Sequence, residues 1–135
     1  MIEYDLISYL ASDAMLDMLL GIVGDDKKIY PSLPTTEPVL PYILYYYGTG
    51  DETDELIDED RIQLTVRAAT KQTATDIRNR LKFLLDRQDE IKNTTFTSAA
   101  YYIYYCKFSA GDGFYEPETK VWNEVLFFLV KYRKK

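Results

Sequence analysis

The sequence contains no histidine and only one cysteine among its 135 residues. Without histidine, the chain lacks the commonest general base and the commonest metal ligand of enzymes, although catalysis without histidine is known. Cys106 has no second cysteine in the chain to pair with and no histidine to activate it as a nucleophile. We therefore predict a buried, unreactive thiol at Cys106, no cofactor, and a protein that is not an enzyme.

Long apolar segments and an export signal are also missing from the sequence. No apolar run approaches the length of about 20 residues that a membrane-spanning helix needs. The first ten residues, MIEYDLISYL, carry acidic side chains where a signal peptide carries basic ones. These absences predict a protein that is made in the cytoplasm and does not enter a membrane.

Basic residues are absent from the most acidic part of the chain. The net charge is −6, and residues 51–60 hold seven of the 22 acidic side chains and none of the 16 basic ones. The remaining 15 acidic residues are balanced by the 16 basic ones, so the excess of negative charge lies in this acidic run. We take its seven carboxylates as candidate residues of an interface or of a channel lining: Asp51, Glu52, Asp54, Glu55, Asp58, Glu59 and Asp60.

Three uses of the acidic run are open from the sequence alone. Several carboxylates together could bind Ca²⁺ or Mg²⁺, but the run lacks the central glycine of an EF-hand loop. Two carboxylates could perform acid–base catalysis, which requires one of them to be buried with a raised pKa. The density of like charge favours the third use, a solvated loop that repels itself. We predict no metal site and a projecting hairpin over residues 48–60.

Tyrosine is abundant, with 13 residues, many of them in the runs YILYYY at 42–47 and YYIYY at 101–105. Two such strands could stack nucleobases, so the alternative function is a nucleic-acid-binding module that uses a tyrosine-rich sheet face. Binding of nucleic acid also needs a positive field, which this acidic chain lacks. Tyrosine is in addition a good residue for strands and for interfaces between proteins. We favour a role in the core and in an interface.

Hydrophobic periodicity predicts two helical regions and five strands. Residues 3–22 have the spacing of a bent or broken helix whose second part starts at Ser12, and residues 73–89 form an amphipathic helix that starts at Thr73. A glycine-containing turn is expected over residues 109–118. The strands are expected at residues 28–30, 42–47, 61–68, 97–108 and 120–132.

The order of these elements, α-β-β-β-α-β-β, predicts an α+β fold in a single domain over residues 1–135. Strands, then a helix, then further strands are typical of a mostly antiparallel sheet, here of four to five strands, with an N-terminal helix and one central amphipathic helix. Residues 61–68 alternate between apolar and polar side chains, which indicates a strand with one solvent-exposed face. Residues 121–130 are apolar on both faces, which indicates an interior strand or contact with a neighbouring subunit.

This arrangement resembles the tail-completion, or tail-terminator, proteins of long-tailed (siphovirus-type) bacteriophages. The resemblance covers nearly the whole chain in the order and length of its elements and in the positions at which they end. Its motifs are loose, because the family is diverse and has no catalytic signature. The segments that carry the resemblance best are Ile29-Tyr30-Pro31, Pro41-Tyr42-Ile43 and Lys131-Tyr132-Arg133 near the end of the last strand.

The resemblance implies a subunit of the virion that assembles into a homo-oligomeric ring of six at the head-proximal end of the tail. Such a ring ends polymerisation of the tail tube and joins the tail to the head. Its partners are the tail-tube protein and a head-completion or connector protein, and DNA passes through its lumen without specific binding. The acidic run is not a family motif. Carboxylates at the lumen would repel phosphate, or they could reach a basic patch on a neighbouring protein.

Overall fold

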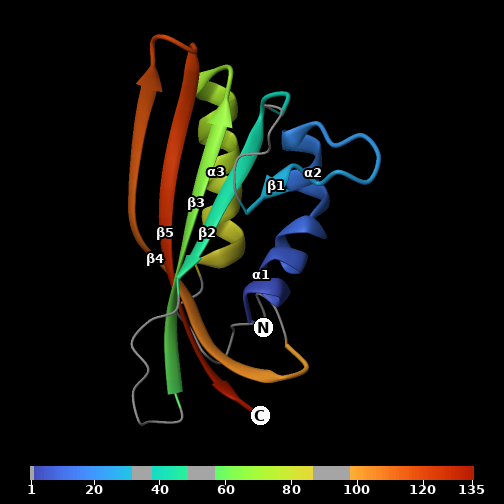
Figure 1. Ribbon diagram of the computed structural model, residues 1–135, viewed down its shortest axis with the longest axis vertical. Helices are drawn as coiled ribbons and strands as arrows, with labels where there is room; N and C mark the ends of the chain where they lie inside the picture. The colour runs from blue at the N-terminus through green and yellow to red at the C-terminus, as the bar shows by residue number, and fades with distance from the viewer. Residues whose placement is uncertain (1, 32–37, 49–56, 87–97) are drawn as a thin grey trace.

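The computed structural model describes residues 2–31, 38–48, 57–86 and 98–135. The order of the elements confirms the predicted α+β class, with the N-terminal helix broken in two (Figure 1). The elements are α1 (Ile2–Ala11), α2 (Ala14–Leu20), β1 (Ile29–Tyr30), β2 (Tyr42–Gly48), β3 (Ile57–Ala68), α3 (Lys71–Leu85), β4 (Tyr101–Glu116) and β5 (Val121–Lys134).

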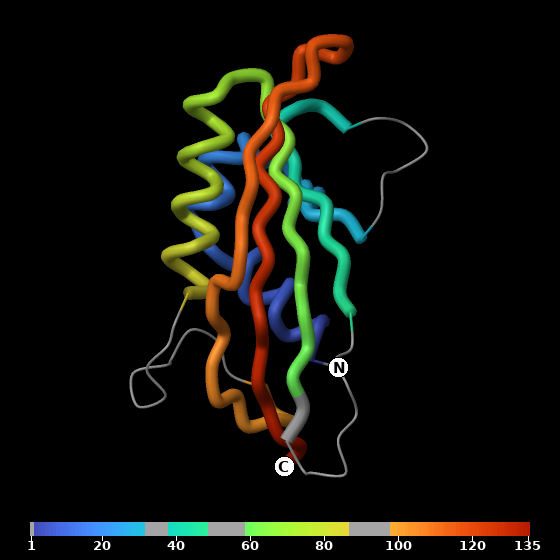
Figure 2. Tube along the Cα trace, turned by 90° about the vertical axis from the view of Figure 1, so that its left-hand side faces the viewer, coloured from blue at the N-terminus to red at the C-terminus, as the bar shows by residue number. Residues whose placement is uncertain are grey.

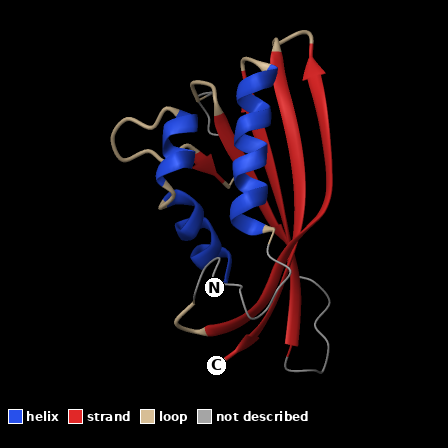
Figure 3. Ribbon diagram, turned by 180° about the vertical axis from the view of Figure 1, so that it is seen from behind, coloured by secondary structure: helices blue, strands red, loops and turns tan. Residues whose placement is uncertain are grey.

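The strands form one five-stranded sheet in the order β1-β2-β3-β5-β4. Among the described strands, the short β1 is parallel to its neighbour β2, and the pairings β2–β3, β3–β5 and β4–β5 are antiparallel. The last strand, β5, lies between β3 and β4, which confirms the prediction of an interior strand. Its pairing with β3 is long and regular, from Ile57 opposite Arg133 to Ala68 opposite Trp122. The helices cover one face of this sheet (Figure 3).

The core lies between the helices and the covered face of the sheet. In β3 the predicted alternation is confirmed, since every second side chain from Ile62 to Ala68 is fully buried. The predicted apolar face of α3 is confirmed as well, with Ile77, Leu81 and Leu84 at 4% exposure or less. The inward side chains, which recur every second residue on β3 and about every 3.6 residues on α3, therefore pack together in one layer.

Both helix starts differ from the prediction by a few residues. Helix α2 is capped by Asp13 instead of Ser12, because the extended backbone of Asp13 lets its Oδ2 accept a hydrogen bond from the Leu16 amide at 2.8 Å. Helix α3 begins before Thr73, because the Thr70 hydroxyl accepts a hydrogen bond from the Thr73 amide at 3.2 Å. In each case the capping oxygen satisfies an amide of the first turn that has no partner within the helix.

The predicted turn over residues 109–118 is wrong, because β4 continues as a strand to Glu116. Gly111 lies opposite Leu126 in the β4–β5 ladder, and the chain turns only after Glu116. A Cβ atom on Gly111 would approach the Phe108 ring to 2.9 Å, so this glycine permits close packing of a ring against the backbone. The glycine was therefore a sign of close approach within a strand and not of a turn.

The strand predicted over residues 61–68 begins earlier in the structure, within the range of the predicted hairpin 48–60. Strand β3 begins at Ile57, so the last three acidic residues of the run lie in the sheet. Glu59 is paired with Lys131, and Asp60 with Val130. Figure 2 shows that this end of β3, with the adjoining ends of β4 and β5, continues past the end of α3. The rest of the predicted hairpin, residues 49–56, lies outside the described residues.

Candidate functional site

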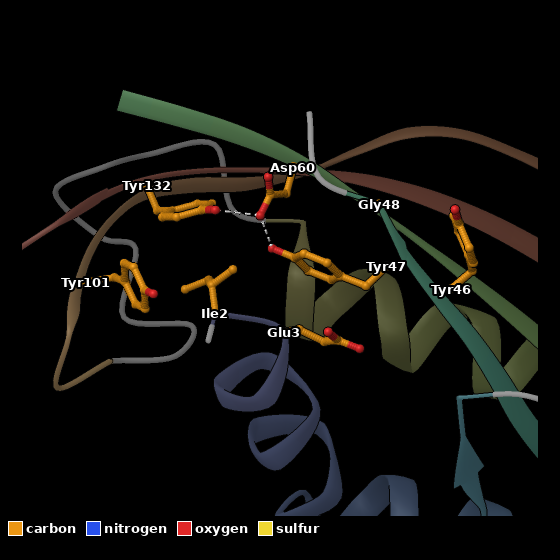
Figure 4. A pocket seen from close by; sticks show the side chains of 8 residues that line it. All are labelled: Ile2, Glu3, Tyr46, Tyr47, Gly48, Asp60, Tyr101 and Tyr132. Atoms are coloured by element: carbon orange, nitrogen blue, oxygen red, sulfur yellow. Dashed lines mark hydrogen bonds between the residues drawn. The ribbon is translucent and has the colours of Figure 1, made fainter. Parts of the chain in front are cut away.

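Asp60 lies at the centre of a cluster of tyrosines near the beginning of β3. It is two residues before Ile62, so the alternation of the strand turns its side chain toward the helix-covered face, and only 3% of it is exposed. The hydroxyls of Tyr47 and Tyr132 both donate hydrogen bonds to Asp60 Oδ2, at 2.5 and 2.6 Å (Figure 4). One carboxylate thus joins β2, β3 and β5 on the buried side of the sheet.

The two phenols stabilise a carboxylate that would otherwise be costly to bury. Hydrogen bonds to an ionised group are short and stronger than those between neutral groups. The pKa of Tyr47 is raised far above its ordinary value, mainly by burial and secondly by the hydrogen bond to Asp60. Tyr47 therefore keeps its proton at neutral pH and remains a donor to Asp60.

A pocket of about 450 Å³ opens beside this cluster. Figure 4 shows Tyr47 and Tyr132 pointing toward Asp60 from opposite sides, with Ile2 and Tyr101 facing the same space. Among the described residues that line it, two side chains are acidic and none is basic. The lining residues are Ile2, Glu3, Tyr46, Tyr47, Gly48, Asp60, Tyr101 and Tyr132.

Glu59 faces the opposite side of the sheet from Asp60. It accepts a hydrogen bond from the Tyr105 hydroxyl at 2.7 Å. Burial and this bond raise the pKa of Tyr105 to about 12. The ammonium groups of Lys107 and Lys131 lie 4.8 and 5.8 Å from the centre of the same ring. The exposed Glu59 is therefore part of a cluster with half-buried basic and aromatic side chains on this side of the sheet.

The candidate carboxylates are thus not brought together at one centre. Asp60 points inward and Glu59 outward, and the side chain of Asp58 is not among those described. The other four candidates, Asp51, Glu52, Asp54 and Glu55, lie outside the described residues. In the described part of the chain, no three histidine, cysteine or carboxylate side chains gather in a way that could hold a metal ion.

The second feature of interest is the sheet face that the helices leave open. In Figure 1 this face is turned to the viewer, with α3 behind it. The ladder places Tyr46, Gln63 and Phe127 side by side across β2, β3 and β5. Tyr46 is 69% exposed and Phe127 38% exposed. Two large aromatic side chains therefore lie exposed on a face that no described helix covers.

The tyrosine runs do not form one stacking surface. In β2, Tyr45 and Tyr47 pack against the core on the helix-covered side, whereas Tyr46 lies on the open side. In β4, Tyr105 contacts Glu59 on the open side, whereas Tyr101 packs against the core. The period of two divides the run in β2 between the two faces, whereas in β4 the irregularity between Ile103 and Tyr105 moves Tyr105 to the face opposite Tyr101.

Cys106 is fully buried in β4, opposite Val130. Burial raises the pKa of its thiol well above the ordinary value of 9.0. The prediction of a buried thiol is confirmed, and the thiolate that would react is disfavoured by its surroundings.

Within the described residues, no helix combines the length and the apolar character that crossing a bilayer requires.

No family model and no curated protein matches this sequence. Among solved structures, the fold is similar to that of a chain in the virion of a native gene transfer agent particle, with a TM-score of 0.71. The similarity covers 96% of this chain and 92% of the other, at 14% sequence identity. At this level of identity, the likeness establishes a common fold over nearly the full length of both chains.

Proposed function

We propose that this protein is a structural component of a bacteriophage virion, and in particular a tail terminator. Six copies would form a ring at the head-proximal end of the tail tube, end its polymerisation and join the tail to the head. The observation that carries the proposal is the likeness, over nearly the whole of both chains, to a chain of a virion particle. The element order that suggested the same class of protein from the sequence is an independent argument for it.

The open face of the sheet supports a role in assembly. Exposed apolar area on a soluble protein often marks a contact with another protein. Tyr46, Gln63 and Phe127 would supply an aromatic and polar surface of the kind that interfaces favour. We therefore assign this face to a neighbouring subunit of the ring or to the tail-tube protein.

The acidic run has a role in this proposal that an isolated monomer would not give it. Asp51, Glu52, Asp54 and Glu55 would face the channel, where carboxylates keep DNA from adhering, or a basic patch on the connector. Neither role needs a catalytic residue or a cofactor, and we propose neither an enzymatic activity nor specific DNA binding.

The direct test is a reconstruction of the virion that contains this protein. We expect the chain in a ring of six between the tail tube and the head. Its absence from the particle, or a ring of another order, would contradict the proposal.

A pair of variants tests the open face within the same particle. Phe127→Lys places a charge on the open face, whereas Met18→Lys places one on the 69% exposed Met18 of the helix layer. We expect both proteins to fold, and only Phe127→Lys to be lost from particles. Equal incorporation of the two variants would show that the open face is not the assembly surface.

A second test replaces Asp51, Glu52, Asp54 and Glu55 by Asn or Gln. The isolated variant should unfold at nearly the same denaturant concentration as the parent chain. Phages that carry it should be defective in tail joining or DNA delivery. Normal infectivity would remove the assembly role of these four carboxylates and leave a solvated loop.

A further inference from the structure

We propose that residues 110–115 of β4 bind an extended basic segment of a different protein, which adds to the sheet as a further strand. We call these residues the β4 edge. The added segment would carry a lysine or arginine opposite Gly113 and an apolar residue opposite Phe114. The β4 edge is distinct from the open face that we assign to assembly, and the inference does not rest on the virion role.

Strand β4 ends the sheet on one side, because β5 is its one neighbour among the described strands (Figure 1). All six residues of the β4 edge are exposed. Their pairing with β5 is regular, from Ala110 opposite Phe127 to Tyr115 opposite Trp122. The stretch contains no lysine, no proline and no shift of register. A regular, exposed edge of this kind is a template for a strand of another chain.

The first half of β4 is protected against such pairing, in contrast to the β4 edge. One register shift lies between Ile103 and Tyr105, and a second lies between Phe108 and Ala110. The side chain of Asp86 accepts a hydrogen bond from the Phe108 amide at 2.9 Å, in the place that an added strand would take. Bulges and covering groups are devices that prevent association of sheet edges. The contrast within one strand indicates that the β4 edge is kept accessible for a partner.

The backbone groups of every second residue of the β4 edge point out of the sheet, beginning with those of Gly113. In an antiparallel ladder, directly opposed residues turn both backbone groups toward each other or both away, in alternation across the sheet. The Ile43 amide points to the β1 side, where it donates to a carbonyl at 2.9 Å. Ile43 lies opposite Val66, Val66 opposite Glu124, and Glu124 opposite Gly113. The N–H and C=O of Gly113, and those of the residues two before and two after it, therefore face away from β5.

Two carboxylates determine the charge that the added segment should carry. Gly113 has no side chain, and the Glu124 carboxylate lies over it, since a Cβ atom at Gly113 would be 2.8 Å from both carboxylate oxygens. A side chain opposite Gly113 would project on the same side and meet this carboxylate. Asp112 is exposed at the neighbouring position, and within the described part of the chain neither carboxylate forms an ion pair. Phe114, 47% exposed, would pack against an apolar residue.

The experiment is an NMR titration of the full ¹⁵N-labelled chain with a capped peptide in which threonine and valine alternate around one central lysine. We expect saturable shifts of the Gly111, Gly113 and Tyr115 amides, with a Kd of about 1 mM, as suits a short segment that must become ordered on binding. The same peptide with glutamate in place of lysine should bind about threefold to tenfold more weakly. Absence of saturable shifts at these amides, or equal binding of the two peptides, would overturn the proposal.

Variants separate the contribution of the backbone from that of the charge. Gly113→Pro removes an outward N–H and no bond to β5, so binding should be lost while the Leu64 amide of the core keeps its shift. Glu124→Gln should weaken binding of the lysine peptide about threefold, whereas Asp25→Asn, in the exposed loop after α2, should leave it unchanged. Asp112→Lys places a lysine on the edge and provides the same test if Gly113→Pro does not fold. Unchanged binding to Glu124→Gln or to Asp112→Lys would overturn the assignment.

Sedimentation equilibrium without peptide distinguishes a segment of a different protein from a second copy of this chain. We expect the parent chain and Asp112→Lys to have the same self-association. A dimer of the parent chain that Asp112→Lys dissociates would assign the β4 edge to a second copy, and it would overturn the proposal.

Discussion

The buried Asp60 allows a strong test of the structure, because its neighbour Glu59 provides a matched control. Asp60 is 3% exposed and accepts two phenolic hydrogen bonds, whereas Glu59 is exposed and accepts one at the surface. Replacing each by its amide removes a charge at adjacent positions of the same strand. The two substitutions differ mainly in burial and in the number of donors.

The expected magnitudes follow from the hydrogen bonds. A bond to a charged group contributes about 1.5–3 kcal/mol, and a buried group left without its partner costs a similar amount. Asp60→Asn turns part of the acceptor into a donor that faces two phenols, so we expect a loss of about 2–4 kcal/mol in the free energy of unfolding. Tyr47→Phe and Tyr132→Phe should each cost about 1–3 kcal/mol. Glu59→Gln should cost less than about 0.5 kcal/mol, as is usual at the surface.

Equilibrium unfolding in urea at pH 7, with circular dichroism as the readout, measures these differences. Because both phenols donate to the same oxygen, the effects of Tyr47→Phe and Tyr132→Phe should not add in the double variant. A cost for Asp60→Asn equal to that of Glu59→Gln would refute the reasoning. It would mean that Asp60 is solvated, as expected of a projecting hairpin.

Three further predictions concern the core and the helix layer. Leu81→Ala should lower the free energy of unfolding by about 2–5 kcal/mol in a denaturant titration. Phe83→Ala, on the exposed side of α3, should lower it by less than about 1 kcal/mol. Equal losses would show that the other face of the helix packs on the sheet. Asp13→Asn keeps the cap of α2 but removes the charge paired with Arg80 at 2.7 Å, so it should cost about 1–2 kcal/mol at pH 7. Hydrogen bonds from Arg80 hold the pKa of Asp13 in the folded protein below its ordinary value of 3.8. The difference in stability between the parent chain and Asp13→Asn should therefore be complete above pH 3.8 and disappear as the pH falls through the folded-state pKa. A stability difference that does not change with pH would contradict this prediction. Cys106 should react with a thiol reagent only as fast as the protein unfolds, and rapid labelling of the folded chain would contradict its burial.

Local periodicity was sufficient to predict most of the fold. The alternation from Ile62 to Ala68 and the apolar face of α3 are properties of short segments, and the structure confirms both. The predicted turn at 109–118 was wrong because glycine occurs in turns and also in strands where a neighbour packs closely. The pairing of Gly111 with Leu126 of β5, which distinguishes the two, is not visible in the local sequence. The predicted N-terminal caps of α2 and α3 were wrong by one and three residues, because neighbouring serine, threonine and aspartate residues can all cap a helix.

The site was harder to predict, although a signal for it was present. Asp60 is two residues before Ile62 and four before Leu64, and both of these side chains point into the core. Extending the same alternation toward the N-terminus would have placed the Asp60 carboxylate in the core. The high charge density of the run favoured a loop instead. The donors could not be identified from the sequence, because Tyr47 and Tyr132 lie 13 and 72 residues from Asp60 and meet it only through the sheet pairing.

The strand pairing explains how an acidic segment can belong to a sheet at all. Like charges on directly opposed strands destabilise a sheet, whereas opposite charges stabilise it. The end of β5 that pairs with the start of β3 is basic, with Lys131 opposite Glu59 and Arg133 opposite Ile57. The acidic start of β3 and the basic end of β5 are therefore complementary, which lets the two strands extend together past α3. The carboxylates that precede β3 in the sequence are the ones that we assign to assembly.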